Sequence, residues 1–319
     1  MQITNIEFSL GNKKETIEDL GKLNPDWVID KILDKTGIET RYILDKGENE
    51  KSLVTDACKK LFEKVNKDEV EGIIHISQSP FSRLPTSACL IQDIIGLRKN
   101  IIAFDLIQGC SGFVYGLSTA SALIRQNGLK KVLIICADTY TKYISNNDRT
   151  NRPIFSDGAA AALLEDTGKG SVGPFSFFTD GSGGDLLTLN QVNGEEQLFQ
   201  DGRQVFKFSF REVPKTFNEL LEKANLDKSD IDLFIFHQAS AVILRQLKSK
   251  LNIPDEKWFQ NIQNIGNTVS ATIPIAIKQA IDRGLYKPNM NIIISIIKVK
   301  KKNKIGYMIQ KLKNKLKKE

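Results

Sequence analysis

The chain has very little histidine and no cysteine pattern typical of metal binding. Its 319 residues include two histidines, His75 and His237, which excludes a histidine-rich metal site. The spacing of its four cysteines fits neither a zinc site nor a disulfide framework. We therefore predict no metal ion, free thiols and a reducing compartment. The cysteines are Cys58, Cys89, Cys110 and Cys136.

Long hydrophobic runs are also absent. No apolar stretch approaches the roughly 18 residues that a membrane-spanning helix needs. The first residues lack the basic and apolar segments of a signal peptide. Hydrophobic residues make up 41% and charged residues 26%, as in ordinary globular proteins. We expect a cytoplasmic protein with a sizeable core, built as one large domain or two smaller ones.

The net charge of +7 comes from one end of the chain. Residues 298–319 contain ten lysines and one glutamate, which leaves a net charge of −2 for residues 1–297. This basic tail gives no indication of a nucleic-acid groove, because a lysine run is usually a solvated segment. In an alternative interpretation, residues 305–318 form a basic amphipathic helix that touches an anionic membrane. We expect no such membrane contact and no nucleic-acid partner.

Apolar strands alternate with helices along most of the chain. Residues 71–76 and 132–137 are short apolar runs, and the second is apolar on both faces, as in a parallel sheet. Between them, apolar residues spaced three or four apart predict helices near 52–65 and 86–97. After Gly158 we expect a strand at the edge of the sheet. The pattern is typical of the α/β class.

The second half of the chain repeats the order of the first. Residues 229–236 match residues 68–75 as an acidic segment followed by an apolar strand. Residues 266–267 match residues 109–110 as a glycine-led turn into a helix of small residues. A duplicated βα unit is the simplest explanation.

This repeat divides the chain into three parts. Residues 1–165 form the first half, and residues 209–319 form the second half together with the basic tail. Between them, residues 166–208 are rich in Gly, Asp and Ser and are expected to form a surface excursion.

Cys110 is the candidate nucleophile. It lies in the turn Gly109-Cys110-Ser111-Gly112, between an apolar strand and a helix of small residues. The backbone N–H groups and dipole of a helix N-terminus favour negative charge, so we expect a depressed thiol pKa. The alternative is a buried, inert cysteine, which is the more common situation for a free thiol.

His237 and Asn267 are the candidate partners of Cys110. His237 directly follows the strand at 233–236, and the crevice beyond strand ends is where α/β sheets bind ligands. Taken alone, His237 could be a structural hydrogen-bonder and Asn267 a plain turn residue. The other histidine, His75, lies within a strand and is most simply a core or sheet-face residue.

Together the three side chains fit one reaction. The thiolate of Cys110 would take an acyl group, while His237 and Asn267 donate hydrogen bonds to the thioester oxygen of a second substrate. That oxygen gains charge when the substrate loses CO2, so two donors would stabilise the enolate. A papain-like protease also uses Cys, His and Asn, but the duplicated α/β pattern does not fit that fold.

The sequence resembles the thiolase-fold condensing enzymes, and most closely the β-ketoacyl-acyl-carrier-protein synthase III family. The resemblance implies duplicated βαβαβ halves that form a five-layered αβαβα core. It also implies that Cys110 carries the acyl group and that His237 and Asn267 promote malonyl decarboxylation. The matching stretches are Asn24–Trp27, Thr36–Ile38, Ala103–Phe113, Phe155–Ala159, Asp201–Phe206, His237–Ala239 and Ile265–Thr268.

The resemblance also implies substrates and partners. Acyl-coenzyme A and malonyl-acyl carrier protein would be the substrates, both as phosphopantetheine thioesters, with no cofactor. Trp27, Lys35 and Arg149 would hold coenzyme A, Gly266 would lie against the substrate, and Leu84 would reach the acyl pocket of the partner in a homodimer. Lys35 stands where the family has arginine.

The end of the chain departs from the family, which raises two alternative functions. After the apolar run that ends at Ser295, the family's glycine-rich turn is replaced by an isoleucine- and lysine-rich segment with no glycine until Gly306. One alternative is an acyltransferase that moves the Cys110-bound acyl group to an alcohol or amine in secondary or surface-glycan metabolism. The other is an inactive partner subunit that keeps the thiolase fold.

Overall fold

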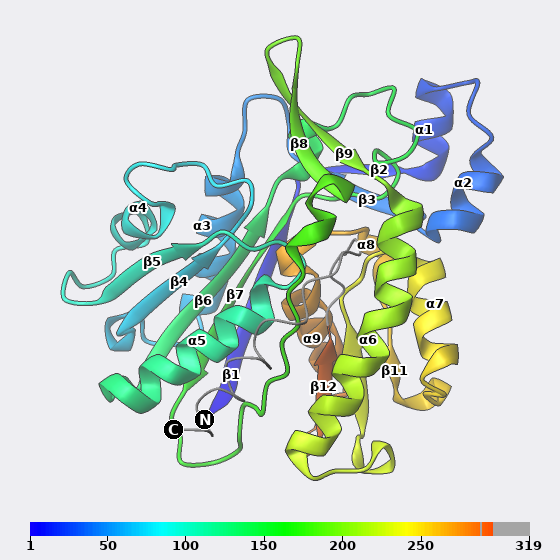
Figure 1. Ribbon diagram of the computed structural model, residues 1–319. Coiled ribbons are helices and arrows are strands. Elements are labelled where there is room, and N and C mark those ends of the chain that lie inside the picture. Colours follow the sequence, from blue (N-terminus) through cyan, green and yellow to red (C-terminus); the bar gives the residue numbers. More distant parts are fainter. Residues whose placement is uncertain (288, 296–319) are drawn as a thin grey trace, which may run out of the picture.

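A five-stranded sheet organises the first half of the chain in the computed structural model, which describes residues 1–287 and 289–295 (Figure 1). Its strand order is β1-β7-β6-β4-β5, with β4 parallel to both β5 and β6. The strands are β1 (Gln2–Leu10), β4 (Gly72–Ile76), β5 (Ile102–Leu106), β6 (Lys131–Asp138) and β7 (Gly158–Glu165).

The central strand β6 is apolar from Val132 to Ala137 because helices cover both faces of the sheet. Alternate side chains point to opposite faces of a strand. Val132 and Ile134 pack into the core shared with the second sheet, whereas Leu133 and Ile135 pack under the outer helices. The outer helices are α3 (Glu50–Phe62) and α4 (Ser87–Ile94), and the inner ones are α5 (Gly112–Asn127) and α9 (Thr272–Asp282).

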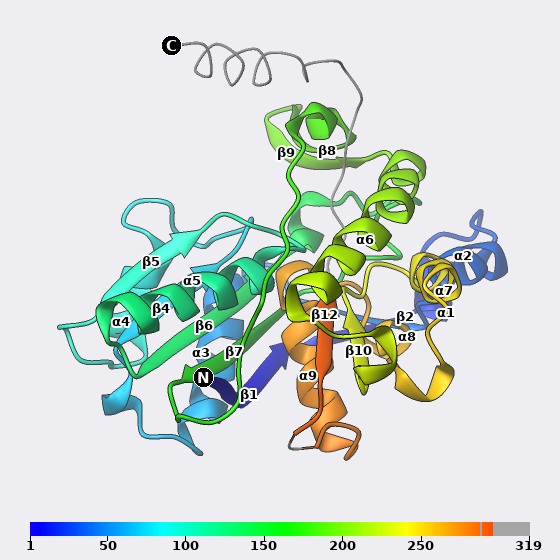
Figure 2. The same cartoon turned by 60° about the horizontal axis from the view of Figure 1, so that its bottom comes forward.

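A second, parallel sheet lies on the other side of α5 and α9. Its described strands are ordered β11-β10-β12 and span Trp258–Phe259, Leu233–Phe236 and Ile292–Ser295. Leu233 and Ile235 face α5 and α9, whereas Phe234 and Phe236 face the outer helices α6 (Gly202–Ala224) and α7 (Ala241–Lys250). The molecule therefore has five alternating layers of helix and sheet, as predicted (Figure 2).

The repeat is visible in equivalent elements of the two halves. A short 3-10 helix precedes β4 (η1, Lys67–Glu69) and another precedes β10 (η4, Lys228–Asp230). The helices that follow the two glycine-led turns, α5 and α9, both occupy the central layer. The weak sequence repeat thus corresponds to equivalent elements in the thiolase-like fold.

The prediction that the strand after Gly158 lies at the edge of the sheet is wrong. β7 lies between β1 and β6 and is antiparallel to both, so β1 is the edge strand. β1 has only a weak sequence pattern, because an edge strand is only partly buried and mixes polar with apolar residues. It pairs along almost its whole length with a strand about 150 residues later in the chain, a partner that a local pattern cannot reveal.

The remaining described elements connect or flank the two core sheets and the helices that cover them. No described helix is long and apolar enough to cross a membrane. The basic tail at 298–319 and the segment after Ser295 lie outside the described residues. These further elements are β2 (Lys13–Thr16), β3 (Thr40–Ile43), α1 (Ile17–Leu23), α2 (Ile29–Thr36), η2 (Tyr140–Tyr143), η3 (Gly181–Leu186), β8 (Leu187–Val192), β9 (Glu195–Gln200), η5 (Asp255–Lys257), α8 (Ile262–Ile265) and η6 (Val269–Ala271).

Candidate active site

The turn that carries Cys110 is held by close packing at two glycines. Its backbone is closed by a hydrogen bond from the Gly112 amide to the Gly109 carbonyl (2.7 Å). A Cβ atom at Gly109 would lie 2.2 Å from Gln78 Oε1, and one at Gly112 would lie 2.3 Å from Ile76 Cγ2. Gly112 therefore requires glycine, whereas a Cβ at Gly109 would require the Gln78 side chain to move. Cys110 lies just before the first turn of α5.

The predicted low pKa of Cys110 is wrong for the resting protein. Burial raises the pKa of its thiol to about 12, and the Asp138 carboxylate adds to the rise. Cys110 packs against an apolar cluster that includes Tyr140, Phe155 and Val269. Desolvation disfavours the thiolate more strongly than backbone hydrogen bonding favours it.

Asn267 is held so that its amide group is free to donate. Gly266 precedes it with φ +78°, and a Cβ there would lie 2.6 Å from Ser156 Oγ. The backbone amide of Asn267 donates to Ile154 O, and its side-chain Oδ1 accepts from the Val269 amide, both at 2.9 Å. Within the described part of the chain, Nδ2 has no hydrogen-bond partner, so it remains available to a substrate.

His237 is also held through one atom and free at the other. It follows β10, is 1% exposed, and donates its backbone amide to Ser295 O (2.8 Å). Its Nδ1 lies 2.6 Å from Thr272 Oγ1, whereas Nε2 has no partner among residues 1–287 and 289–295. Burial lowers the pKa of His237 to about 3, so the ring is neutral at physiological pH.

Val269 connects the three candidate catalytic residues. Its side chain belongs to the cluster against which Cys110 packs, its amide binds Asn267, and its carbonyl lies 3.1 Å from Thr272 Oγ1. Thr272 in turn contacts His237. The structure thus brings Cys110, Asn267 and His237 to one short segment at the start of α9.

Asp138 accepts hydrogen bonds from this segment, and it was not among the site residues predicted from the sequence. Its buried carboxylate accepts from the Gln78 amide (2.9 Å) and from the amide and hydroxyl of Ser270 (3.1 and 2.6 Å). Burial raises the pKa of Asp138 to about 7, against the opposing effect of the Ser270 hydrogen bonds. Its position at the end of an apolar strand was the available signal, because polar groups there lie at the site.

The other predicted binding residues differ in exposure. Trp27 is 8% exposed and packs among the apolar residues of α1 and α2, so it offers little surface to an adenine ring. Lys35 and Arg149 are exposed. Leu84 is 93% exposed, in the loop between β4 and α4.

His75 lies in the core, as the sequence indicates, within a polar group. Its Nε2 lies 2.7 Å from Glu50 Oε1, and its Nδ1 lies 3.4 Å from Asp105 Oδ1. Burial by itself lowers the pKa of His75, but the two carboxylates outweigh burial and raise the pKa to about 9. His75 is therefore a buried cation at neutral pH.

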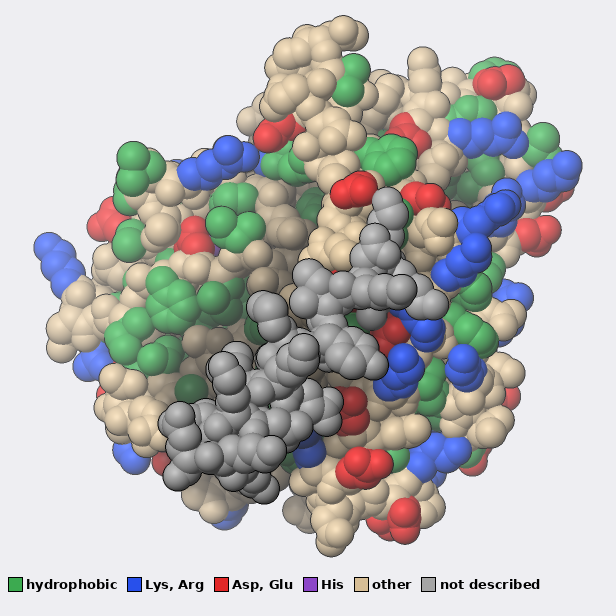
Figure 3. Space-filling model, viewed as in Figure 1, with side chains coloured by type: hydrophobic (Ala, Val, Ile, Leu, Met, Phe, Trp, Pro, Cys, Tyr) green, Lys and Arg blue, Asp and Glu red, His purple; other side chains and the backbone are tan. Residues whose placement is uncertain are grey.

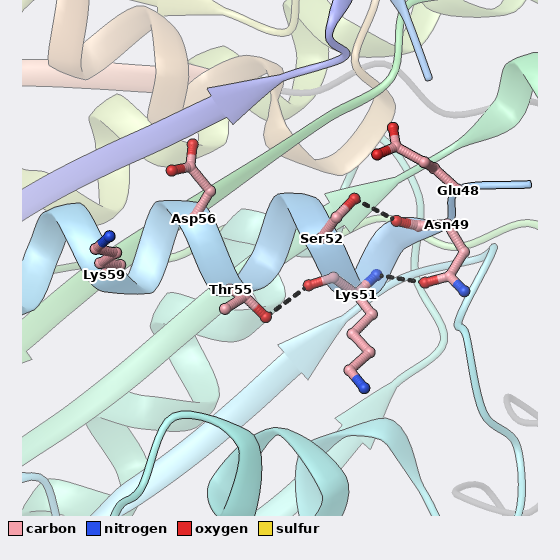
Figure 4. Close-up of a pocket in the computed structure, with 7 residues that line it drawn as sticks. All are labelled: Glu48, Asn49, Lys51, Ser52, Thr55, Asp56 and Lys59. Carbon is pink, nitrogen blue, oxygen red and sulfur yellow. Dashed lines mark hydrogen bonds between the residues drawn. The ribbon is translucent and has the colours of Figure 1, made fainter. Parts of the chain in front are cut away.

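A hollow of about 490 Å³ on the start of α3 is separate from these residues (Figure 4). Its polar side chains are engaged locally: Ser52 and Thr55 donate to backbone carbonyls one turn earlier, and Asn49 accepts the Lys51 amide. Among the described residues, no group of three His, Cys, Asp or Glu side chains is arranged to hold a metal ion. The candidate active site therefore consists of the Cys110 turn, the start of α9 and His237, which contacts it.

Two family profiles match the chain. One, described as 3-oxoacyl-[acyl-carrier-protein (ACP)] synthase III, matches residues 104–181 and includes Cys110. The other, described as the C-terminal part of 3-oxoacyl-[acyl-carrier-protein (ACP)] synthase III, matches residues 221–297 and includes His237 and Asn267.

Full-length relatives and solved structures agree with the profiles. The β-ketoacyl-[acyl-carrier-protein] synthase III of Clostridium perfringens is 35% identical over 296 residues, which are 88% of this chain and 90% of the relative. That of Streptococcus sanguinis is 35% identical over 272 residues, covering 82% and 83%. The crystal structure of 3-oxoacyl-[acyl-carrier-protein] synthase III from Aquifex aeolicus superposes with a TM-score of 0.86 at 32% identity, covering 92% of this chain and 95% of the other.

Proposed function

Because the chain belongs to the β-ketoacyl-[acyl-carrier-protein] synthase III family, we propose that it condenses an acyl-coenzyme A primer with malonyl-acyl carrier protein in fatty-acid biosynthesis. One observation carries the mechanism. His237 and Asn267 are each fixed through one polar atom, and within the described residues Nε2 of His237 and Nδ2 of Asn267 have no hydrogen-bond partner. Both are neutral groups, and both contact the segment at the start of α9 against which Cys110 packs.

The first step transfers the acyl group to Cys110. The Cys110 sulfur forms a bond to the acyl carbon, and the bond between that carbon and the coenzyme A sulfur breaks. The Cys110 proton leaves with the departing coenzyme A thiol. Because burial raises the pKa of the Cys110 thiol, we expect this proton to be removed as the new bond forms.

The second step generates the carbon nucleophile. The bond between the malonyl carboxylate and its α-carbon breaks, CO2 leaves, and the electron pair becomes an enolate on the thioester. Nε2 of His237 and Nδ2 of Asn267 donate hydrogen bonds to the enolate oxygen. Removing one such donor from an oxyanion site typically costs 10²–10³-fold in rate.

The third step forms the product. The enolate carbon attacks the acyl carbon on Cys110, a carbon–carbon bond forms, and the carbon–sulfur bond breaks. The Cys110 sulfur leaves as a thiolate and takes a proton from solvent. The products are a β-ketoacyl-acyl carrier protein, CO2 and coenzyme A.

We propose that the acyl carrier protein binds to the cationic face formed by α6 and α7. Lys and Arg side chains gather on the right of Figure 3, where α6 and α7 lie, and α7 begins four residues after His237. Arg245 lies one turn into α7 and is exposed, which supports it as a contact for the carrier. Lys35 and Arg149 remain the proposed contacts for coenzyme A. The exposed cations of this face are Arg203, Lys207, Arg211, Lys215, Arg245 and Lys250.

We propose that the protein is a homodimer paired through β5. This strand is an edge of the larger sheet, and its apolar residues are only half-buried. Ile107, directly after it, is 73% exposed, and Leu84 in the neighbouring loop is 93% exposed. Hydrophobic side chains also gather over this side of the molecule in Figure 3. An exposed apolar edge strand is a surface that readily pairs with a second copy.

We propose a cytoplasmic location because the cysteines of the chain are unpaired. All four are free thiols, as expected in a reducing, cytoplasmic environment. The two alternative functions, acyl transfer to an alcohol or amine and an inactive partner subunit, are not favoured by the comparisons.

Two variants test the assigned roles. Cys110→Ala should give no acyl adduct by intact-mass spectrometry after mixing with acyl-coenzyme A. His237→Ala should still form the adduct but release CO2 from malonyl-acyl carrier protein at least about 10²-fold more slowly. If His237→Ala also fails to acylate, His237 acts as the base for the thiol and its assigned role is wrong.

A further inference from the structure

The Thr272 hydroxyl lies between two groups that can accept its proton. Thr272 is the first residue of α9 and is 2% exposed. Its Oγ1 lies 2.6 Å from Nδ1 of His237 and 3.1 Å from the Val269 carbonyl oxygen. A hydroxyl has one proton, so it can donate to only one of them.

The choice decides which ring nitrogen of His237 carries the proton. The ring is neutral and therefore has a single N–H. If Thr272 donates to Nδ1, the ring proton is on Nε2. If Thr272 donates to Val269, Nδ1 must carry the proton and donate to Thr272, and Nε2 then has only a lone pair.

We propose that Thr272 donates to Nδ1 of His237 and thereby holds the histidine in the form that carries its proton on Nε2. The contact to Nδ1 is 0.5 Å shorter than the contact to Val269, and hydrogen bonds from hydroxyl groups favour separations near 2.7 Å. This inference rests on the proposed condensing function, because an N–H at Nε2 is what the enolate requires.

Thr272 is therefore a positioning residue that acts through His237. It lies 35 residues later in the chain and reaches the ring only because η6 and the start of α9 pack against the end of β10. The contact at Nδ1 also orients the ring, because Nε2 lies on the side of the ring away from this contact.

The experiment reads the proton position directly by long-range ¹H–¹⁵N correlation NMR on protein labelled with ¹⁵N-histidine. With two histidines in the chain, the spectrum has two ring systems. The His237→Ala variant, which lacks one of the two, assigns the ring system of His237. His237 in the wild-type protein should show the Nε2–H pattern, and an Nδ1–H pattern would overturn the proposal.

Variants of Thr272 add a functional measurement. Thr272→Val removes the hydroxyl at nearly constant volume and should shift His237 toward Nδ1–H and slow CO2 release about 10²-fold, with Cys110 acylation unchanged. Thr272→Ser keeps a hydroxyl and should therefore retain both the Nε2–H pattern of His237 and the rate of CO2 release. Thr216→Val is the matched control, because Thr216 also bonds a helix carbonyl, on α6, away from the site.

The outcomes separate this inference from the proposed function. Retention of the Nε2–H pattern and of the full rate in a folded Thr272→Val variant would show that the hydroxyl does not select the proton position. If the wild-type protein releases no CO2 from malonyl-acyl carrier protein, the proposed function fails, while the NMR pattern still decides the role of Thr272. Should Thr272→Val not fold, the wild-type spectrum alone decides.

Discussion

Val269 is the residue at which the structure departs most clearly from ordinary backbone geometry. Its φ is +54°, a region that β-branched side chains rarely occupy. Such a conformation costs about 1–3 kcal/mol and persists where the surroundings over-determine it. Here the amide and carbonyl of Val269 bind Asn267 and Thr272, and its side chain packs beside Cys110. This strained conformation therefore positions Asn267 and, through Thr272, His237, which are the hydrogen-bond donors of the site.

His75 makes the stability of the protein depend on pH above neutrality. The folded protein holds its proton up to about pH 9, whereas the unfolded chain releases it near 6.5. The unfolded state therefore binds fewer protons in this window, and the free energy of unfolding should fall as pH rises from 6.5 to 9. Stability from this group is fully present below 6.5 and should decrease by roughly 3 kcal/mol across the window.

Urea unfolding at several pH values measures this decrease. Glu50→Gln removes the nearest carboxylate, lowers the His75 pKa and should reduce the decrease. His237 releases its proton well below this window. Asp138, whose pKa burial raises to about 7, still titrates at the start of the window, so the difference between the wild-type protein and Glu50→Gln isolates the contribution of His75. An NMR titration in which His75 loses its proton near 6.5 would contradict the prediction.

Among the elements, α5 and α9 hold the chemistry because they occupy the central layer. Each begins in the same region, α5 after the Cys110 turn and α9 at Thr272. Their apolar faces meet in one core cluster with strands of both sheets. A shift of either helix start would therefore separate the nucleophile from the hydrogen-bond donors.

The start of α5 gives a matched pair of glycine variants. Gly112 is the first residue of α5, and an added Cβ would overlap Ile76 Cγ2, an atom fixed close to its own backbone. Gly112→Ala should lower the free energy of unfolding by about 1–3 kcal/mol and slow acylation of Cys110. Urea unfolding and intact-mass kinetics measure the two effects.

Gly202, the first residue of α6, is the control. Nothing lies within 4 Å of a Cβ added there. Gly202→Ala should therefore be neutral or stabilise by about 0.4–1 kcal/mol, because it restricts the unfolded chain. Equal losses in the two variants would mean that close packing at Gly112 does not fix the turn.

At the scale of the whole molecule, the five layers leave β5 as an open edge of the larger sheet. The proposed dimer predicts that sedimentation of the wild-type protein at micromolar concentration gives twice the chain mass. Ile107→Asp places a charge beside this edge and should shift the protein to monomer.

A control variant distinguishes the effect of a charge beside the β5 edge from that of a charge elsewhere on the surface. Leu23 is 63% exposed at the end of α1, on the opposite side of the molecule (Figure 1). Leu23→Asp should leave the dimer intact. A wild-type protein that sediments as a monomer would refute the pairing.

Much of the architecture was predictable because it depends on local patterns. Apolar runs, helical spacing and glycine-led turns define β4, β6, α3 and α5, and the repeat indicates the layered fold. β1 was missed because its partner β7 is distant in sequence, and β7 was placed at the edge for the same reason. Strand neighbours are a property of the assembled sheet.

The sequence by itself determined the chemical groups, Cys110, His237 and Asn267, and their positions after strands and turns. Only the tertiary structure decided how those groups ionise. Burial beside Asp138 raises the thiol pKa that the helix N-terminus was expected to lower, and burial keeps His237 neutral. Desolvation depends on every neighbour of a side chain, and those neighbours come from segments far apart in the sequence.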